Sequence, residues 1–204
     1  MHSVLPAIII AFAAYLIGSL SFAVIVAKLM GLPDPRSFGS GNPGATNMLR
    51  TGKKTAALFT LLGDLTKGWL AVWLAGLVGA HFGVAILATH LAALAVFLGH
   101  LFPVFFRFKG GKGVATALGI LLALNVWMGI SVLAVWLVVF AATRVSSLAA
   151  LSASVSAPLL GAYFIGDRLT TLVLFILTAL LLWRHRGNIQ RLISGEEGRF
   201  AKPK

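Results

Sequence analysis

Long, uninterrupted runs of apolar residues constrain the fold of this sequence more than any other feature. The first run extends from Val4 to Ala27 without an acidic or basic residue. A helix needs about 20 such residues to cross the hydrocarbon core of a membrane. The run is too long for the apolar region of a cleavable signal peptide, and no basic region precedes it. We therefore expect it to remain in the protein as a membrane-spanning helix.

The whole composition agrees with a membrane protein. Of the 204 residues, 59% are hydrophobic and only 11% are charged, and the mean hydropathy is +0.96, a profile that soluble domains do not show. We predict an all-α, polytopic membrane protein that forms a single membrane-embedded domain over residues 1–204. Its seven spans are expected near residues 4–28, 56–78, 82–105, 114–125, 127–143, 148–165 and 169–183.

The basic residues sort to one side of this seven-span arrangement. With the N-terminus outside, fourteen of them fall on the cytoplasmic side, and the other side holds only Arg168. Because an excess of Lys and Arg marks cytoplasmic loops, the C-terminal tail should also lie in the cytoplasm. The fourth span is shorter than a regular crossing requires, so we expect it to be tilted, partly embedded or re-entrant.

Composition also argues against several kinds of function. The net charge of +12 could suggest a nucleic-acid partner, but the 17 basic residues are separated by apolar spans instead of gathering on one soluble face. The sequence has no cysteine, which excludes thiolate nucleophiles, disulfides and cysteine-ligated metals. We expect no nucleic-acid partner, no metal and no cofactor.

The segment GSGNPGATN, residues 39–47, cannot continue a helix. Gly and Pro raise the free energy of a helix, and Ser and Asn compete for its backbone hydrogen bonds. Such a loop leaves several backbone N–H groups outside secondary structure, which suits an anionic ligand. A plain turn between two membrane helices is the alternative interpretation.

A second glycine-rich loop, residues 109–113, is expected on the same cytoplasmic side. It places two lysines among three glycines and then opens a helix, whose N-terminus directs unpaired N–H groups and the positive end of its dipole toward the loop. This pattern is typical of phosphate binding. The spacing of a Walker A loop is absent, so the pattern favours a small phosphate over a nucleotide.

A third polar cluster, WRHRGNIQRLISGEEGRF, follows the last span. Basic residues at such a place usually anchor lipid headgroups, which accounts for the arginines. His185 and Asn188 share one helical face at positions i and i+3, so both side chains could contact one ligand. Glu197 is expected to pair with a basic loop residue and to hold the tail in place.

Two ionisable residues lie inside the second expected span. Asp64 and Lys67 are three residues apart, and charged groups within a membrane segment are costly unless they are paired. We expect a mutual ion pair that faces the helix bundle.

Three segments, in this order, are similar to the motifs of one known family. GSGNPGATN, GHLFPVFFRFKGGKGVAT and HRGNIQRLISGEE resemble those of the bacterial acyl-phosphate:glycerol-3-phosphate acyltransferases, the PlsY family, and the likeness covers essentially the whole chain. The resemblance implies seven membrane helices in the bacterial inner membrane, with a cytoplasmic active site. It implies transfer of a fatty acyl group from acyl phosphate to the sn-1 hydroxyl of glycerol-3-phosphate, which gives lysophosphatidic acid and phosphate and begins phospholipid biosynthesis. The implied partners are these two small-molecule substrates and the lipid bilayer, without an obligate protein partner.

The resemblance also implies residue roles at matching positions. Ser40 and Arg50 are the candidates for the essential serine and arginine of the first motif. His185 and Asn188 match the essential pair of the third motif, while Ser147, with Ser146 as the alternative, resembles a polar contact from a neighbouring helix. The other substrate-binding candidates lie in or beside the two glycine-rich loops: Gly41, Asn42, Thr46, Asn47, Lys109, Gly110, Gly111, Lys112, Gly113 and Thr116. Either lysine could be the closer phosphate ligand.

The expected chemistry is direct transfer. Ser40 has no Gly-x-Ser-x-Gly elbow and no obvious triad partner, so we expect it to orient a substrate rather than to attack. The base is either His185 or the phosphate of the substrate itself. The chain lacks the His-x-x-x-x-Asp arrangement of the other major glycerol-phosphate acyltransferases, so acyl-CoA and acyl-carrier-protein donors are not supported.

An organophosphate transporter is the main alternative of a different class. It is disfavoured because the basic residues lie on one face of the membrane only and because no convincing inverted repeat is present.

Overall fold

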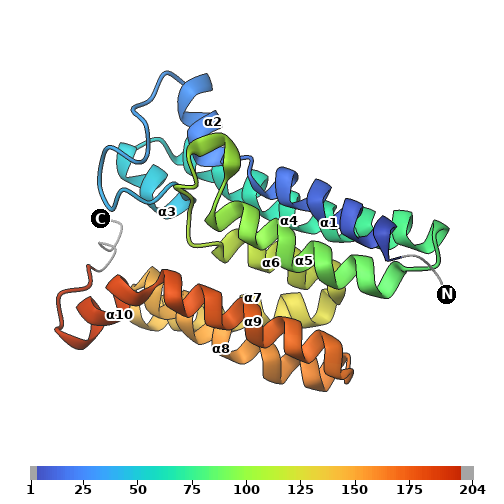
Figure 1. The fold of residues 1–204 in the computed structure, drawn as a ribbon. Helices are drawn as coiled ribbons and strands as arrows, with labels where there is room; N and C mark the ends of the chain where they lie inside the picture. Colours follow the sequence, from blue (N-terminus) through green and yellow to red (C-terminus); the bar gives the residue numbers. More distant parts are fainter. Residues whose placement is uncertain (1–3, 199–204) are drawn as a thin grey trace. The chain divides into compact units, whose positions relative to one another are not determined.

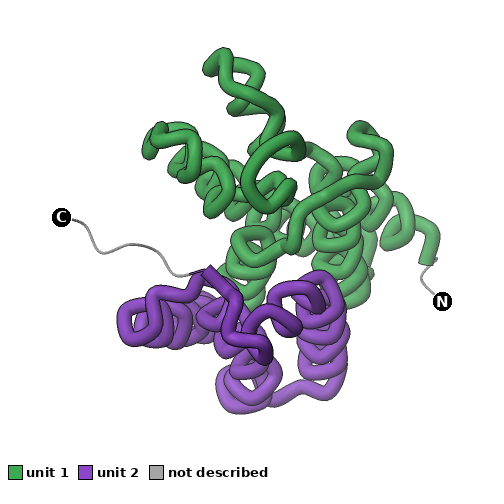
Figure 2. The backbone as a smooth tube through the Cα atoms, turned by 90° about the vertical axis from the view of Figure 1, so that its left-hand side faces the viewer, with its two compact units in different colours: residues 1–124 green, residues 125–204 purple. Residues whose placement is uncertain are grey.

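The computed structural model describes residues 4–198, and within this range all regular structure is helical. The helices form two compact units, residues 1–124 and 125–204 (Figure 2), which are described separately below. Among the described residues, four helices are long and apolar enough to cross a membrane, or up to six if each of two bent pairs is one span. The expected all-α membrane fold is confirmed at this level, whereas the seven crossings and their orientation stay predictions.

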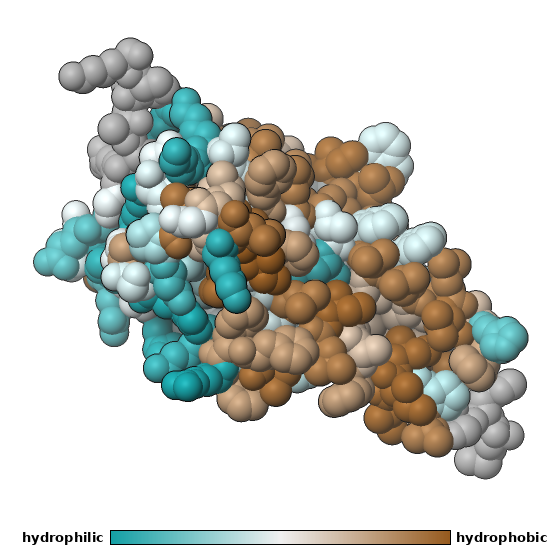
Figure 3. Space-filling model, turned by 90° about the horizontal axis from the view of Figure 1, so that it is seen from above, coloured by the Kyte–Doolittle hydropathy of each residue, from teal (hydrophilic) through white to brown (hydrophobic). Residues whose placement is uncertain are grey.

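A bundle of four helices builds most of the first unit. In Figure 1, α1 (Leu5–Gly18), α4 (Lys54–His81), α5 (Ala85–Leu101) and α6 (Val114–Leu124) run side by side. α5 packs against both α1 and α4, and α4 also packs along α6. On the face seen in Figure 3, hydrophilic residues gather toward one end and hydrophobic residues cover most of the remainder, as expected for helices that lie in lipid.

Glycines allow the backbones of these helices to approach closely. A Cβ added at Gly99 of α5 would overlap the carbonyl oxygen of Tyr15 in α1, and one at Gly119 of α6 would overlap that of Leu65 in α4. Small residues at helix contacts are the usual means of tight packing in membranes, where burial of apolar surface supplies little driving force between helices.

The first expected span, residues 4–28, is not one helix. It breaks into α1 and α2 (Phe22–Leu29), which are bent by 41° at residues 19–21. The Ser19 hydroxyl donates to the carbonyl of Tyr15 (2.9 Å) and accepts from the N–H of Val104 (3.3 Å). Serine hydroxyls that bond to backbone groups of a helix favour such bends, and apolar content alone did not reveal this break.

The other expected spans coincide with helices to within four residues at each end. α6 has 11 residues, which at about 1.5 Å per residue covers roughly half of the hydrocarbon thickness. Its expected shortness is therefore confirmed. Three short elements complete the unit at the loop end of the bundle: α3 (Ala45–Met48) and the two 3₁₀ turns η1 (Leu49–Thr51) and η2 (Val104–Phe106).

The second unit contains α7 (Val126–Thr143), α8 (Ser146–Phe164), α9 (Arg168–Arg184) and α10 (Arg186–Ile193). α8 packs against both α7 and α9. Side-chain caps begin two of these helices, because Asn125 accepts from the N–H of Met128 (3.0 Å) and Asp167 accepts from that of Thr170 (2.9 Å). α10 continues from α9 after a bend of 62°.

Candidate active site

The first glycine-rich loop, residues 39–47 (loop 1), is organised around the side chain of Asn47. This residue is only 1% exposed. Its Oδ1 accepts from the N–H of Ser40 (3.0 Å) and from the Ser40 hydroxyl (3.3 Å), and the guanidinium of Arg50 donates to the same oxygen (3.4 Å). One buried amide oxygen therefore brings together the two residues that are the candidate serine and arginine of the first motif.

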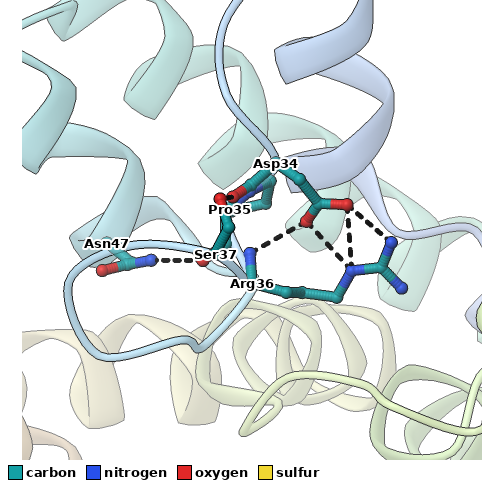
Figure 4. Close-up of polar contacts among 5 residues, drawn as sticks. All are labelled: Asp34, Pro35, Arg36, Ser37 and Asn47. Atoms are coloured by element: carbon teal, nitrogen blue, oxygen red, sulfur yellow. Dashed lines mark hydrogen bonds and ion pairs between the residues drawn. The ribbon is translucent and has the colours of Figure 1, made fainter.

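The amide nitrogen of Asn47 holds the other side of loop 1. It donates to the carbonyls of Pro35 (2.7 Å; Figure 4) and Phe38 (3.2 Å). Gly39 has a φ of +59°, and a Cβ at this position would overlap Oδ1 of Asn47, so the loop requires glycine here for both its conformation and its space. Asn47 stays a predicted substrate contact, but the structure uses both ends of its amide to shape the loop.

An ion pair precedes loop 1. Arg36 contacts Asp34 through Nε (2.9 Å) and Nη2 (2.6 Å), and its guanidinium carbon lies 5.8 Å from the ring centroid of Phe106 (Figure 4 shows the pair). The hydrogen bond from Arg36 holds the pKa of the Asp34 carboxyl below its usual value, against the opposing effect of burial. The pair therefore stays charged near neutral pH and fixes the direction of the arginine.

The second glycine-rich loop, residues 109–113 (loop 2), passes close to loop 1. The N–H of Gly111 donates to the carbonyl of His100 at the end of α5 (3.1 Å). A Cβ added at Gly111 would lie 3.1 Å from the carbonyl oxygen of Pro43 in loop 1. The absence of a side chain at Gly111 therefore allows the two loops to lie close together.

A cleft of about 570 Å³ lies where the two loops meet. Three cationic side chains, two aromatic rings and the backbone of both loops form its wall: Arg36, Gly41, Pro43, Phe105, Phe106, Arg107, Lys109 and Gly110. Lys109 is exposed in the cleft, whereas Lys112 is half-buried and does not line it. Three cationic side chains in one cleft suit a phosphate.

Behind loop 2, buried polar side chains connect α4, α5 and α6. Thr116 is fully buried, and its hydroxyl lies 3.1 Å from Nδ1 of His100. Asp64 and Lys67 form the expected ion pair, with 2.8 Å between Oδ1 and Nζ. The sequence therefore predicted the pairing correctly, but it did not show that His100 adjoins this pair, with Nδ1 at 3.6 Å from Oδ1 of Asp64.

The second unit gathers the polar residues of the third motif around Glu197. This carboxylate accepts from the Ser147 hydroxyl (2.6 Å), the Asn188 amide (2.5 Å) and Nε of Arg191 (2.7 Å). Burial opposes its ionisation, but these hydrogen bonds outweigh that effect and lower the pKa of Glu197 from its usual value. Glu197 does pair with a basic residue, but this partner, Arg191, lies in α10 and not in a loop as expected. These contacts tie the tail to α8 and α10.

His185 lies at the junction of α9 and α10 and is 3% exposed. Its Nδ1 is 2.9 Å from the carbonyl oxygen of Leu181. Because a carbonyl can only accept, Nδ1 carries a proton, and in the neutral tautomer the lone pair of the ring is on Nε2.

The candidate residues thus form one group in each unit. Ser40, Gly41, Asn47, Arg50 and the residues of loop 2 belong to the first unit, with Thr116 behind them. Asn42 is half-buried and Thr46 exposed on loop 1, outside the cleft wall, and Gly113 is buried in loop 2. His185, Asn188 and Ser147 belong to the second unit, where the half-buried Ser146 opens α8.

Several residues of these groups were not expected from the sequence. Asp34 and Arg36 are separated by a single proline and directly precede loop 1, which could have drawn attention to them. His100 is the one polar residue in the segment VFLGHLFP before loop 2. No local pattern distinguishes Arg107 from an ordinary basic loop residue.

Comparisons with known proteins show which proteins this chain resembles. Residues 8–195 match the family model described as glycerol-3-phosphate acyltransferase. A glycerol-3-phosphate acyltransferase of Paraburkholderia phymatum is 58% identical over 197 residues, which cover 97% of this chain and 94% of the relative. One of Ralstonia nicotianae is 53% identical over 204 residues, covering 100% of this chain and 99% of the relative.

Two solved structures share the fold. They are crystal structures of PlsY (YgiH), an integral membrane glycerol 3-phosphate acyltransferase. Its glycerol 3-phosphate form has a TM-score of 0.89 and 39% identity, covering 96% of each chain. Its lysophosphatidic acid form has a TM-score of 0.87 and 38% identity, covering 96% of this chain and 95% of the other. With a matching family model, close relatives and the same fold, this chain belongs to the PlsY family of glycerol-3-phosphate acyltransferases, which are integral membrane enzymes.

Proposed function

We propose that this enzyme transfers a fatty acyl group from acyl phosphate to the sn-1 hydroxyl of glycerol-3-phosphate. The hydroxyl oxygen bonds to the acyl carbon, the bond between that carbon and the phosphate oxygen breaks, and the hydroxyl proton leaves with the base. The products are lysophosphatidic acid and inorganic phosphate. The observation that carries the proposal is the cationic cleft between loops 1 and 2, because both substrates present a phosphate.

Positioning supplies most of the proposed catalysis. Acyl phosphate is a mixed anhydride with a good leaving group, so the main requirement is to hold the hydroxyl about 3 Å from the carbonyl carbon. In this proposal Arg50 and a loop lysine hold glycerol-3-phosphate, and glycine N–H groups hold the acyl phosphate. The same donors meet the charge that develops on the carbonyl oxygen. The cleft wall favours Lys109 for this role.

Ser40 orients a substrate in this mechanism and forms no acyl intermediate. Its hydroxyl lies beside the amide oxygen of Asn47, which cannot remove a proton, so nothing in loop 1 activates the serine as a nucleophile. The proton of the attacking hydroxyl passes to Nε2 of His185 or to an oxygen of the substrate phosphate. Asn188 and Ser147, with Ser146 as the alternative, complete the proposed contacts.

The proposed membrane arrangement has seven crossings, with the N-terminus outside and the C-terminus in the cytoplasm. The chain would act as a single membrane-embedded domain in the bacterial inner membrane, with its active site on the cytoplasmic side. The excess of basic residues in one set of loops supports this orientation. The acyl chain could then lie among lipid tails while its phosphate reaches the basic loops.

The test is phosphate release by the purified protein in detergent. Palmitoyl phosphate is supplied with and without glycerol-3-phosphate, and palmitoyl-CoA is the control donor. Release that requires both substrates and matches lysophosphatidic acid one to one supports the proposal. Arg50→Ala should abolish it, whereas Arg168→Ala, which removes the basic residue expected on the other side of the membrane, should not. Turnover with palmitoyl-CoA, or none with folded protein, would contradict the proposed donor.

A further inference from the structure

Three ionisable side chains are buried together in the first unit, and the proposed mechanism does not use them. Asp64 and Lys67 of α4 are each 3% exposed, and His100 of α5 is 7% exposed. Buried charges in a membrane segment cost free energy even when they are paired. Replacing a buried ion pair by apolar residues is often neutral or stabilising. The contacts of Asp64, Lys67 and His100 therefore indicate whether these side chains have a role beyond packing.

His100 contacts the middle of loop 2 and the first turn of the helix that follows it. Its carbonyl accepts from the N–H of Gly111, its imidazole lies so close to Gly111 that a Cβ there would overlap Nε2, and its Nδ1 is 3.1 Å from the hydroxyl of Thr116. Thr116 lies in the first turn of α6, immediately after the loop. His100 therefore supports both the middle of loop 2 and the first turn of α6, the helix start that is expected to direct its N–H groups toward a phosphate.

The ion pair of α4 orients this histidine. Oδ1 of Asp64 is 2.8 Å from Nζ of Lys67 and 3.6 Å from Nδ1 of His100, and among residues 4–198 it has no well-aligned hydrogen bond. These are charge contacts, which act without strict alignment. Asp64 thus lies beside Nδ1 on one side, while Thr116 contacts the same atom from another.

Lys67 extends the network toward loop 1. Its Nζ donates to the carbonyl of Leu20 (2.6 Å), which lies at the break between α1 and α2. The break leaves this carbonyl available to a side chain. The buried charges therefore contact both the support of loop 2 and the α1–α2 break.

We propose that His100, held by the Asp64–Lys67 ion pair, is a positioning residue that sets the phosphate-binding geometry of loop 2. The role rests on the proposed function, since it assumes that loop 2 binds a substrate phosphate. The network contacts no reacting atom and acts through Gly111 and Thr116. Lys67 ties this support to the α1–α2 break.

The first test compares two histidines of the same helix. His100→Leu removes the imidazole under loop 2, whereas His90→Leu removes one that contacts the carbonyl of Ile86 within α5 (2.7 Å). For His100→Leu we expect the KM for glycerol-3-phosphate or acyl phosphate to rise so that kcat/KM falls about tenfold to a hundredfold. His90→Leu should stay near wild type. His100→Asn, whose amide can occupy the place of Nδ1, should recover part of the loss.

The second test uses two Thr→Val variants, because this substitution keeps the shape of the side chain and so is less disruptive to folding. Thr116→Val removes the hydroxyl beside His100, and Thr60→Val removes an equally buried hydroxyl of α4 that bonds to the carbonyl of Ala56. Both substitutions keep side-chain shape. We expect the KM to rise for Thr116→Val alone, at thermal stabilities that match between the two variants. Asp64→Asn should change the KM in the same direction as His100→Leu.

Hydrogen exchange separates this proposal from the proposed function. Amide exchange of residues 110–113 should be faster in His100→Leu and Thr116→Val than in wild type and both controls, whether or not the assay detects turnover. Wild-type protein without turnover would contradict the proposed reaction, yet faster exchange would still support the anchoring of loop 2. Unchanged exchange and unchanged KM in the folded variants would overturn the positioning role and leave the ion pair as a packing feature.

Discussion

At the scale of single residues, loop 1 depends on one amide and one glycine. The Oδ1 atom of Asn47 holds Ser40 and Arg50 together, and Gly39 leaves the space that this oxygen occupies. Glu197 has a similar role in the second unit, where it holds Ser147, Asn188 and Arg191. In both places one buried or half-buried polar side chain, Asn47 or Glu197, positions side chains that are expected to contact substrate.

Gly39→Ala should lower kcat/KM by at least about tenfold, because the new methyl group would displace the Asn47 amide and with it Ser40 and Arg50. Gly52→Ala is the matched control. Gly52 also has a left-handed φ, of +78°, but a Cβ there would meet nothing within 4 Å. Both variants carry the backbone cost of about 1–2 kcal/mol, so steady-state kinetics of the two separate strain from displacement. Equal kinetic losses would contradict this account of loop 1.

Glu197→Gln should destabilise the protein most at neutral pH. The folded pKa of Glu197 lies below the ordinary value of 4.5, so its stabilising effect is fully present above that value and is lost as the pH falls through the folded pKa. The difference in melting temperature between wild type and Glu197→Gln should therefore shrink on acidification. A difference that does not depend on pH would argue against an ionised Glu197 in the folded state.

At the scale of elements, the packing of α6 against α4 holds the helix that directly follows loop 2. α6 is too short to span on its own, and it packs along α4 through glycines. Gly119 faces the backbone of Leu65, which cannot move aside, whereas a Cβ at Gly76 of α4 would meet only the hydroxyl of Thr89 at 3.4 Å. The same substitution should therefore have opposite effects at the two sites.

Gly119→Ala should destabilise the protein by about 1–3 kcal/mol through overpacking. Gly76→Ala should be neutral or stabilising by up to about 1 kcal/mol, because alanine favours a helix more than glycine does. Thermal unfolding in detergent gives both values, and any melting temperature of Gly119→Ala at or above that of Gly76→Ala would be inconsistent with the packing described.

At the scale of the whole molecule, the orientation in the membrane is open to a direct test because the sequence contains no cysteine. Single cysteines can replace the exposed residues Lys53 and Arg168. An impermeant thiol reagent applied to intact cells with a permeable outer membrane should label Arg168→Cys. Lys53→Cys should react only after the inner membrane is opened. The reverse pattern would invert the proposed topology, and labelling of both in intact cells would place both residues outside and require an even number of crossings between them.

The sequence by itself determined the membrane class, most helix bounds, the two glycine-rich loops and the Asp64–Lys67 pair. These features depend on local composition and on spacing within one element, which a linear pattern records. It could not predict the break at residues 19–21, because serine hydroxyls bend a helix only where a partner such as the N–H of Val104 is present. The sequence also left open whether Lys109 or Lys112 is the closer phosphate ligand. Lys109 lines the cleft and Lys112 does not, which favours Lys109 in the proposed mechanism.

Only the tertiary structure decided which distant residues meet. His100 lies 36 residues from Asp64 and 16 from Thr116, and Ser147 lies 50 from Glu197. Such contacts follow from how helices pack, and packing depends on the shapes of whole surfaces rather than on any local motif. The sequence therefore predicted the chemical groups of the candidate site, whereas only the tertiary structure showed the buried side chains that position them.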